Sequence, residues 1–262
     1  MSRRRRAPSA EVRSVTIPPA PRRDISRERI LALLANGDVD VQGLLPWSTN
    51  YTFLISVQDS QLEMIAVYKP CRGERPLWDF PHGTLCKREY AAYRVSEALE
   101  WDLVPPTVLR DGPHGLGSVQ LFIDCDTDQH YFTLKDVHQN EFRRMAVFDA
   151  LLNNTDRKGG HCLVDQNGKI WAIDHGVTFH CEPKLRTVIW DFAGQPIPSD
   201  ILADLVRLGE RMDNQDPVIR ELTELLAPEE ILALRGRLQE LIESARFPEP
   251  DANWYTVPWP PV

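Results

Sequence analysis

No apolar run in this sequence approaches the roughly 18 residues that a helix needs to cross a bilayer. The basic N-terminus, MSRRRRAPSAEVRS, is not followed by an apolar stretch, so we expect no secretory signal there. Cysteine is scarce, and the five cysteines are odd in number and irregular in spacing, which is typical of reduced thiols. Together these absences predict a cytoplasmic protein without a transmembrane segment.

Positively charged residues are also fewer than negatively charged ones. The sequence has 30 Lys and Arg against 38 Asp and Glu, so the formal net charge is -8. An acidic surface repels phosphates, so we expect no specific nucleic-acid partner for the folded body. The chain has 262 residues, of which 42% are hydrophobic and 26% charged. These are ordinary globular values, and the length is sufficient for two lobes with a real core.

The pattern of apolar residues divides the chain into two parts. Residues 25–125 favour a sheet with helices, and residues 126–247 are mostly helical with one hairpin at 162–173. This order predicts an α+β fold with a β-rich N-lobe and a mostly helical C-lobe. We expect strands at 39–45, 51–57, 64–68, 108–110 and 117–123, and helices between Ser26 and Gly37 and at 85–101, 140–153, 199–213, 216–226 and 228–246.

The two ends of the chain differ from this body. Residues 1–24 are rich in Arg and Pro and are expected to be disordered. Arginines 3–6 are more simply interpreted as part of a solvated tail than as a membrane or nucleic-acid contact. Residues 248–262 hold five prolines and three large aromatics. We expect this tail to pack extended against the body, because three free aromatics would form a costly exposed patch.

The most informative stretch is 151–176, LLNNTDRKGGHCLVDQNGKIWAIDHG. Asp156 and Arg157 follow an apolar helix-like run on a loop, and Asp174 ends a strand after the hairpin. Two carboxylates at this spacing can converge on one nucleotide and its metal ion, which is typical of phosphoryl transfer. Asp156 is the candidate base or orienter of the acceptor, and Asp174 is the candidate metal ligand. Arg157 either positions the loop or meets a phosphate.

Lys69 is a candidate phosphate-binding cation, because it ends the apolar segment MIAVYK. Glu89 lies in the next helical segment and can pair with it; the alternative is an ordinary surface lysine at a strand end. Ser48, Thr49 and Asn50 lie between two expected strands, where hydroxyls and backbone amides can donate to phosphate oxygens. The segment has no GxGxxG pattern, so an ordinary turn is the alternative.

His161 occupies the position expected for a second metal ligand. A neutral imidazole binds Mg²⁺ less well than Mn²⁺ or Zn²⁺, so either the metal preference is shifted or this position binds no metal. A zinc site is a rival hypothesis, but no CxxC or HxxxH spacing supports it and adjacent strand residues point to opposite faces. Its candidate ligands are His161, Cys162, His175, His180 and Cys181.

These motifs resemble the phosphatidylinositol 3-/4-kinase-like branch of the kinase superfamily, which includes the HipA-like and actin-fragmin-kinase-like proteins. That branch has D-R-H-x-x-N followed by I-D-F-G, and the matching stretches here are residues 156–161 (DRKGGH) and 173–176 (IDHG). Within the branch, the chain is most similar to a small bacterial family of actinobacterial type. The resemblance covers residues 25–246 and implies a two-lobed protein-kinase-like fold with an ATP site between the lobes.

The resemblance also assigns roles to single residues. It implies that Lys69 is the phosphate lysine, Asp156 the catalytic aspartate and Asp174 the metal aspartate. Phe122 and Ile123 are implied to lie near the hinge that holds adenine. The chain departs from the pattern at three positions, and its size leaves no room for the accessory domains of lipid kinases. The departures are Lys158 for His, His161 for Asn and His175 for Phe.

The leading hypothesis is an ATP-dependent phosphotransferase that uses Mg²⁺ or Mn²⁺. Its acceptor is an unidentified hydroxyl on a protein, a lipid or a small molecule. A pseudokinase that binds nucleotide or a partner without turnover is the first alternative, because the Asn position is replaced by His161. An AMP transferase on the same fold is the second, because the transferred group depends on which way the nucleotide lies.

Overall fold

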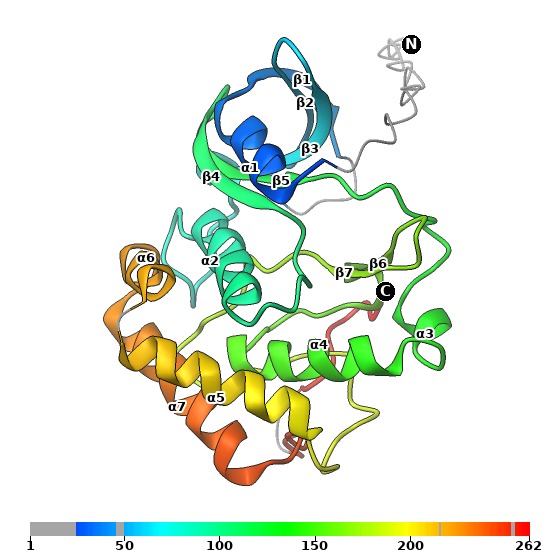
Figure 1. The fold of residues 1–262 in the computed structure, drawn as a ribbon, viewed down its shortest axis with the longest axis vertical. Coiled ribbons are helices and arrows are strands. Elements are labelled where there is room, and N and C mark those ends of the chain that lie inside the picture. Colours follow the sequence, from blue (N-terminus) through cyan, green and yellow to red (C-terminus); the bar gives the residue numbers. More distant parts are fainter. Residues whose placement is uncertain (1–24, 46–49, 215, 253–254) are drawn as a thin grey trace, which may run out of the picture.

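The computed structural model describes residues 25–45, 50–214, 216–252 and 255–262. Residues 1–24, for which we predict a disordered tail, lie outside these ranges. A small sheet lies at one end of the molecule and a group of helices at the other, with α2 (Leu85–Ala98) between them (Figure 1). We call β1–β5 with α1 the sheet lobe, and α3–α7 with β6 and β7 the helical lobe.

The sheet lobe is a single antiparallel sheet. Its strand order is β1-β2-β3-β5-β4, so β3, which carries Lys69, is the central strand. Residue Lys69 pairs with Ser118 of β5, and Tyr68 pairs with Val119. The strands are β1 (Asp38–Leu44), β2 (Phe53–Gln58), β3 (Glu63–Pro70), β4 (Thr107–Gly112) and β5 (Gly115–Leu121).

One face of this sheet is closed by α1 (Arg27–Asn36). The helix begins after Ser26, whose hydroxyl accepts a hydrogen bond from the backbone N–H of Arg29 at 3.3 Å, as an N-cap residue does. Leu33 and Leu34 of α1 pack with buried side chains of the sheet. These side chains are Ile55, Val57, Ala66, Tyr68 and Val119.

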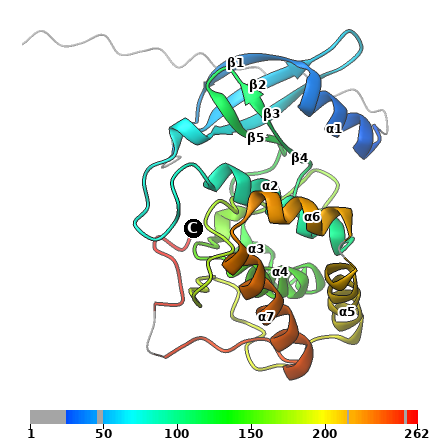
Figure 2. The same cartoon turned by 90° about the vertical axis from the view of Figure 1, so that its left-hand side faces the viewer.

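The helical lobe holds the larger core. Wholly buried Phe142, Met145, Phe148 and Leu151 make α4 its central helix. Figure 2 shows α4, α5 and α7 grouped below the sheet lobe. The elements are α3 (Tyr131–Leu134), α4 (Gln139–Leu152), β6 (Cys162–Val164), β7 (Ile170–Ala172), α5 (Ser199–Asp213), α6 (Pro217–Leu225) and α7 (Pro228–Ser244), with short 3₁₀ turns at Cys71–Gly73 and Gly159–His161.

Helix α2 packs with the helical lobe. Its apolar residues, among them Ala91, Ala92 and Val95, belong to the larger core rather than to the core of the sheet lobe. The buried guanidinium of Arg88 adds to this attachment. It donates to the carbonyl of Thr178 at 2.7 Å and to Oε1 of Glu230 in α7 at 2.5 Å.

The expected strands and helices are present, with shifted ends. The helix expected at 85–101 ends at Ala98, because Glu100 and Asp102 adopt positive φ values of 58° and 53°. The short helix α3 is not among the expected elements. No helix in the described ranges is both long and apolar enough to cross a membrane.

The prediction that all five cysteines are reduced thiols is wrong for two of them. Cys71 and Cys86 are joined by a disulfide across 15 residues of chain. Cys71 follows the end of β3, and Cys86 lies in the first turn of α2. Sequence spacing hides this pair because the loop between them folds back on itself. The free cysteines are Cys125, Cys162 and Cys181.

Replacing both Cys71 and Cys86 by serine should lower the free energy of unfolding by about 3 kcal/mol, because the bond closes a loop of this length in the unfolded chain. Denaturant unfolding measures the difference. Cys181→Ser is the matched control, since that cysteine is free and exposed, and it should change little. Equal stability of the double variant and the parent would contradict the pairing.

Candidate active site

Lys69, Glu89 and Asp174 come from three elements and meet between the lobes. Lys69 is in β3, Glu89 is in α2, and Asp174 lies just after β7. The Nζ of Lys69 is hydrogen-bonded to Oε1 of Glu89 and lies 2.9 Å from Oδ1 of Asp174. Burial alone would lower the pKa of Lys69, but the two carboxylates outweigh it and raise that pKa. The ammonium therefore stays charged, as contact with phosphates requires.

Asp174 combines an accessible carboxylate with an unusual backbone. Its φ is +62°, in the left-handed region that residues other than glycine rarely adopt. The N–H of the next residue, His175, donates to Oε2 of Glu89 at 2.9 Å and holds this turn. The Asp174 side chain remains 49% exposed. The Lys69 ammonium holds the pKa of Asp174 well below its usual range, so the carboxylate is ionised. Such strain is concentrated at functional sites.

Asp156 stands at the start of the loop formed by residues 156–161. Its backbone N–H donates to Oδ1 of buried Asn154 at 3.0 Å, and the Nδ2 of Asn154 donates to Asp149 at 2.9 Å. The Asp156 carboxylate lies 3.1 Å from Nζ of Lys158. Burial raises the pKa of Asp156 in spite of the Lys158 ammonium. A raised pKa makes a carboxylate a better proton acceptor at neutral pH.

Arg157 is wholly buried and is bound to Asp149, which is wholly buried in α4. Its Nε lies 3.0 Å from Oδ2 of Asp149, and its Nη2 lies 3.0 Å from Oδ1. The same guanidinium donates to the carbonyl of Ile173 at 2.7 Å. Of the two roles considered for Arg157, burial favours positioning, because a buried guanidinium does not reach a phosphate. It ties the 156–161 loop to the backbone just before Asp174.

His161 ends that loop and faces Asp174. The Nε2 of His161 lies 3.3 Å from Oδ2 of Asp174. Burial lowers the pKa of His161 to about 4, so the imidazole is neutral at physiological pH. The backbone N–H of Lys158 donates to Nδ1 at 3.4 Å, which leaves the proton on Nε2, toward Asp174. A neutral imidazole and an ionised carboxylate thus lie side by side.

Comparison with known proteins shows the family of this chain. Protein Rv2133c of Mycobacterium tuberculosis is 39% identical over an alignment of 264 positions, and the alignment covers 87% of this chain and 94% of that protein. The family described as phosphatidylinositol 3- and 4-kinase matches residues 108–215. The chain belongs to the phosphatidylinositol 3-/4-kinase-like superfamily, in the same family as the mycobacterial protein.

Other similar proteins and structures are more distant. Phosphatidylinositol 4-kinase gamma 4 of Oryza sativa is 32% identical over an alignment of 121 positions, and the alignment covers 38% of this chain and 20% of that protein. The structure of hydra Fam20 with sugar has a TM-score of 0.50 at 16% identity, covering 86% of this chain and 90% of that one. The crystal structure of the Helicobacter pylori proinflammatory kinase CtkA has a TM-score of 0.48 at 16% identity, covering 81% of this chain and 95% of that one. The fold is an α+β, kinase-like one.

The remaining predicted site residues are Ser48, Thr49, Asn50, Phe122 and Ile123. Ser48 and Thr49 lie outside the described residues. The Oδ1 of Asn50 accepts a hydrogen bond from the backbone N–H of Arg75 at 2.8 Å, so this side chain holds a neighbouring loop. Phe122 follows β5 and donates its N–H to the carbonyl of Ile65 in β3 at 3.0 Å. Ile123 is buried beside it, where the chain leaves the sheet lobe.

The rival zinc site has no geometric support in the described part of the chain. The one group of metal-binding residue types that converges there is Cys71, Glu74 and Cys86; its two sulfurs are joined in the disulfide, and none of the three belongs to the predicted set. His175 instead approaches Arg157, with its Nε2 2.6 Å from Nη2 of the guanidinium. Burial lowers the pKa of His175 well below its usual value, so Nε2 accepts this hydrogen bond as a neutral ring atom.

Sequence reasoning missed the role of Asp149. It lies in the apolar stripe of the 140–153 helix. The other residues of this stripe are apolar and cannot pair with a carboxylate. A carboxylate in such a stripe requires a buried cation or several donors. Asp149 has both, since Arg157, Asn154 and Thr187 all donate to it. The stripe was therefore a usable signal for the buried ion pair.

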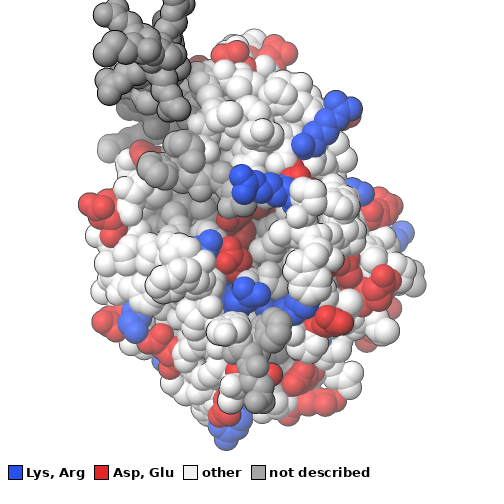
Figure 3. All heavy atoms as spheres, turned by 180° about the vertical axis from the view of Figure 1, so that it is seen from behind, with Lys and Arg blue, Asp and Glu red and all other residues white. Residues whose placement is uncertain are grey.

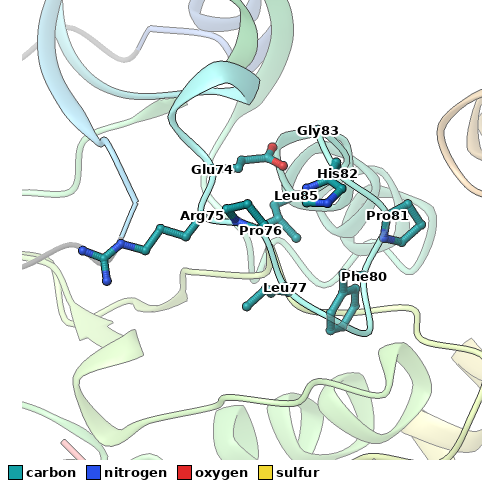
Figure 4. Close-up of a pocket in the computed structure, with 9 residues that line it drawn as sticks. All are labelled: Glu74, Arg75, Pro76, Leu77, Phe80, Pro81, His82, Gly83 and Leu85. Atoms are coloured by element: carbon teal, nitrogen blue, oxygen red, sulfur yellow. The ribbon is translucent and has the colours of Figure 1, made fainter.

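One face of the molecule is hollowed and mixed in charge. In Figure 3, which views the molecule from behind, acidic side chains lie deep at mid-height, with basic side chains around them. A separate hollow of about 10 Å³ lies in the loop before α2, lined by residues such as Glu74, Phe80 and Leu85 (Figure 4). It is smaller than the usual range for ligand pockets. Arg75 points away from the other lining residues (Figure 4).

Arg157→Met should lower the free energy of unfolding by about 3–5 kcal/mol, because it leaves the buried Asp149 carboxylate without its partner. Chemical denaturation measures this. Arg144→Met is the matched control on α4, since its ion pair with Asp200 is exposed and should be worth less than about 1 kcal/mol. Adding Asp149→Leu to Arg157→Met should recover part of the loss; no recovery would rule out an uncompensated charge as the cause.

His161 should make the metal-free protein less stable as the pH falls from about 6.5 to about 4. In the unfolded chain an imidazole takes up its proton near pH 6.5, whereas His161 in the folded chain stays neutral down to about 4. The unfolded state therefore binds more protons across this window. Unfolding titrations of the parent and His161→Asn in a chelator measure the difference in slope. Parallel curves would show that His161 is not held neutral.

Proposed function

We propose that this protein is an ATP-dependent phosphotransferase, which moves the γ-phosphoryl group of ATP to the hydroxyl of an acceptor. The observation that carries the proposal is the meeting of Lys69, Glu89 and Asp174, with Lys69 bound to both carboxylates. Phosphoryl transfer needs cations on the phosphates, a metal and an orienter of the acceptor, and little covalent chemistry. The family supports the same class of reaction.

Nucleotide binding is assigned to the side of the site formed by residues 25–125. Lys69 contacts the α- and β-phosphates, and Glu89 holds the ammonium extended. The loop with Ser48, Thr49 and Asn50 covers the phosphates. Phe122 and Ile123, at the exit from the sheet lobe, receive the adenine. Residues 126–247 supply the 156–161 loop and Asp174, and residues 248–262 form a tail.

A divalent metal ion fits the residues present. The exposed, ionised carboxylate of Asp174 is an oxygen ligand that Mg²⁺ and Mn²⁺ accept, and the neutral His161 beside it favours Mn²⁺. Asp174 would hold the ion, and His161 would join it after its proton moves from Nε2 to Nδ1. When bound, the ion neutralises negative charge on the phosphates of ATP.

Asp156 orients the acceptor hydroxyl and receives its proton. The hydroxyl oxygen forms a bond to the γ-phosphorus, and the bond from that phosphorus to the β,γ-bridging oxygen breaks to release ADP. The proton leaves Asp156 for solvent. Lys69 stabilises the charge on the departing phosphates. We place the reaction in the cytoplasm, where ATP is abundant.

A pseudokinase is the second candidate. His161 motivates it, because it replaces the amide ligand of the family pattern and its Nε2 proton faces Asp174. The presence of Lys69, Asp156 and Asp174 together argues against it. Transfer of AMP instead of a phosphoryl group would use the same residues with ATP bound in the reverse orientation. Labelled ATP distinguishes phosphoryl transfer, AMP transfer and a pseudokinase.

The first experiment follows γ-labelled and α-labelled ATP with the purified protein in Mg²⁺ and then Mn²⁺. We expect the γ label on an acceptor or as released phosphate. Asp174→Asn should abolish metal-dependent nucleotide binding, and Asp156→Ala should lower turnover about 10²–10⁴-fold while sparing binding. Asp200→Asn, at an exposed carboxylate of α5, is the control.

Each other labelling result rejects part of the proposal. Transfer of the α label alone would mean AMP transfer. Nucleotide binding with neither label transferred or released would favour the pseudokinase. Full turnover in Asp156→Ala would remove Asp156 from the catalytic role.

His161→Asn should move the metal preference toward Mg²⁺, because an amide oxygen suits this harder ion better than an imidazole nitrogen does. The ratio of turnover in Mg²⁺ to turnover in Mn²⁺ measures the shift and should rise. An unchanged ratio would show that His161 does not contact the metal.

A further inference from the structure

The last residues of the chain lie against the 156–161 loop, although about a hundred residues separate the two in sequence. Figure 1 and Figure 2 both place the C-terminal end at mid-height, below the sheet lobe, and Figure 1 shows it beside β6 and β7. We call residues 255–262 the tail segment. The carbonyl of Pro261 accepts a hydrogen bond from the backbone N–H of Gly159 at 2.7 Å.

A second contact anchors the other end of the tail segment. The carbonyl of Thr256 accepts from the backbone N–H of Thr187 at 3.0 Å and from Nε1 of Trp190 at 3.1 Å. Thr187 also forms a β-bridge with Arg157, so this anchor adjoins the 156–161 loop as well. The tail segment is thus held at one end by Thr187 and at the other by Gly159 of the 156–161 loop.

The loop is shaped for close approach of another backbone. A Cβ atom at Gly159 would lie 3.3 Å from the carbonyl oxygen of Pro261 and 3.1 Å from the Phe132 ring. A Cβ atom at Gly160 would lie 3.9 Å from Val262. Gly159 directly follows Lys158, which is paired with Asp156. The two glycines therefore belong to the same short loop as Asp156, the candidate orienter of the acceptor.

The three hydrogen bonds above use carbonyl groups of the tail segment and none of its side chains. The two large aromatic side chains point to solvent, since Tyr255 is 86% exposed and Trp259 is 88% exposed. Prolines at 258, 260 and 261 favour an extended backbone. Recognition of an extended backbone through its main-chain groups, with little dependence on side chains, is how proteins bind peptide segments.

The tail segment holds no acceptor where it meets the loop. Residues 257–262 are Val-Pro-Trp-Pro-Pro-Val, and none has a hydroxyl group. The nearest hydroxyl in the segment belongs to Thr256, at the far anchor. The segment therefore lies on the loop that begins with Asp156 without offering an oxygen to the γ-phosphoryl group.

We propose that the acceptor is an extended peptide segment of a protein, bound through its backbone on Gly159 and Gly160, and that the tail segment is a built-in competitor for this place. The inference rests on the proposed phosphotransferase function. In the transfer, a serine or threonine oxygen of the peptide bonds to the γ-phosphorus, the bond to the bridging oxygen of ADP breaks, and the hydroxyl proton passes to Asp156. Displacement of the tail segment precedes this step.

The test converts the competitor into a substrate. Pro261→Ser and Val262→Ser, each in the full chain, place a hydroxyl on the two residues that meet Gly159 and Gly160. With γ-labelled ATP, at least one variant should take one phosphate on the introduced serine, at a rate independent of protein concentration. Leu232→Ser, at an exposed position of α7, is the matched control and should take none. Adding Asp156→Ala should abolish the labelling.

A second variant tests competition. Replacing Pro258, Pro260 and Pro261 by glycine loosens the tail segment in the full chain. Transfer to a synthetic peptide of residues 255–262 with the Pro261→Ser substitution should then rise about tenfold or more over the parent, because a tethered competitor acts at high effective concentration. The unsubstituted peptide should inhibit this transfer.

The outcomes separate the inference from the proposed function. If ATP is consumed but neither serine variant is labelled and the glycine variant gains nothing, the peptide acceptor is wrong and the proposed function stands. If no variant consumes ATP, the proposed function fails. The acceptor inference fails with it, because binding of the unsubstituted peptide to the glycine variant would not by itself show phosphoryl transfer.

Discussion

The buried ion pair between Asp149 and Arg157 is the constraint on which the site depends. Two charges without solvent cannot be left unpaired, so α4 and the 156–161 loop have one mutual arrangement. Arg157 extends this constraint by binding the carbonyl of Ile173. Asp156 and Asp174, which lie 18 residues apart in the sequence, are thereby fixed relative to one helix. The acidic site is built on a basic residue that solvent does not reach.

Glu89 performs the matching task on the sheet-lobe side of the site. One carboxylate oxygen meets the Lys69 ammonium, and the other accepts the N–H of His175. The residue therefore joins the central strand of the sheet lobe to the turn that presents Asp174. Because Arg88, the preceding residue, is bound to Glu230 in α7, α2 is held in place by the helical lobe.

Much of this arrangement was predictable from the sequence, and the failures have physical causes. The order of strands and helices followed from apolar periodicity, and the two aspartates followed from their spacing around the hairpin. The disulfide was missed because pairing of Cys71 with Cys86 depends on the path of the loop between them, which composition does not determine. Residues 255–262 of the tail lie against the body, as predicted, but burial of aromatic side chains is not the reason. Thr256 and Pro261 are held through their carbonyls, whereas Tyr255 and Trp259 remain exposed.

The position of α2 decides whether the two halves of the protein are separable. In sequence, α2 precedes residue 125 and belongs with the strands, but its apolar face completes the core of the helical lobe. A chain cut near residue 125 would part Ala91, Ala92 and Val95 from the helical lobe whose core they share. The small core around Tyr68 and Leu34 would have to stabilise five strands alone. Each fragment would then expose apolar surface and aggregate, so the lobes are a unit of folding even though they differ in architecture.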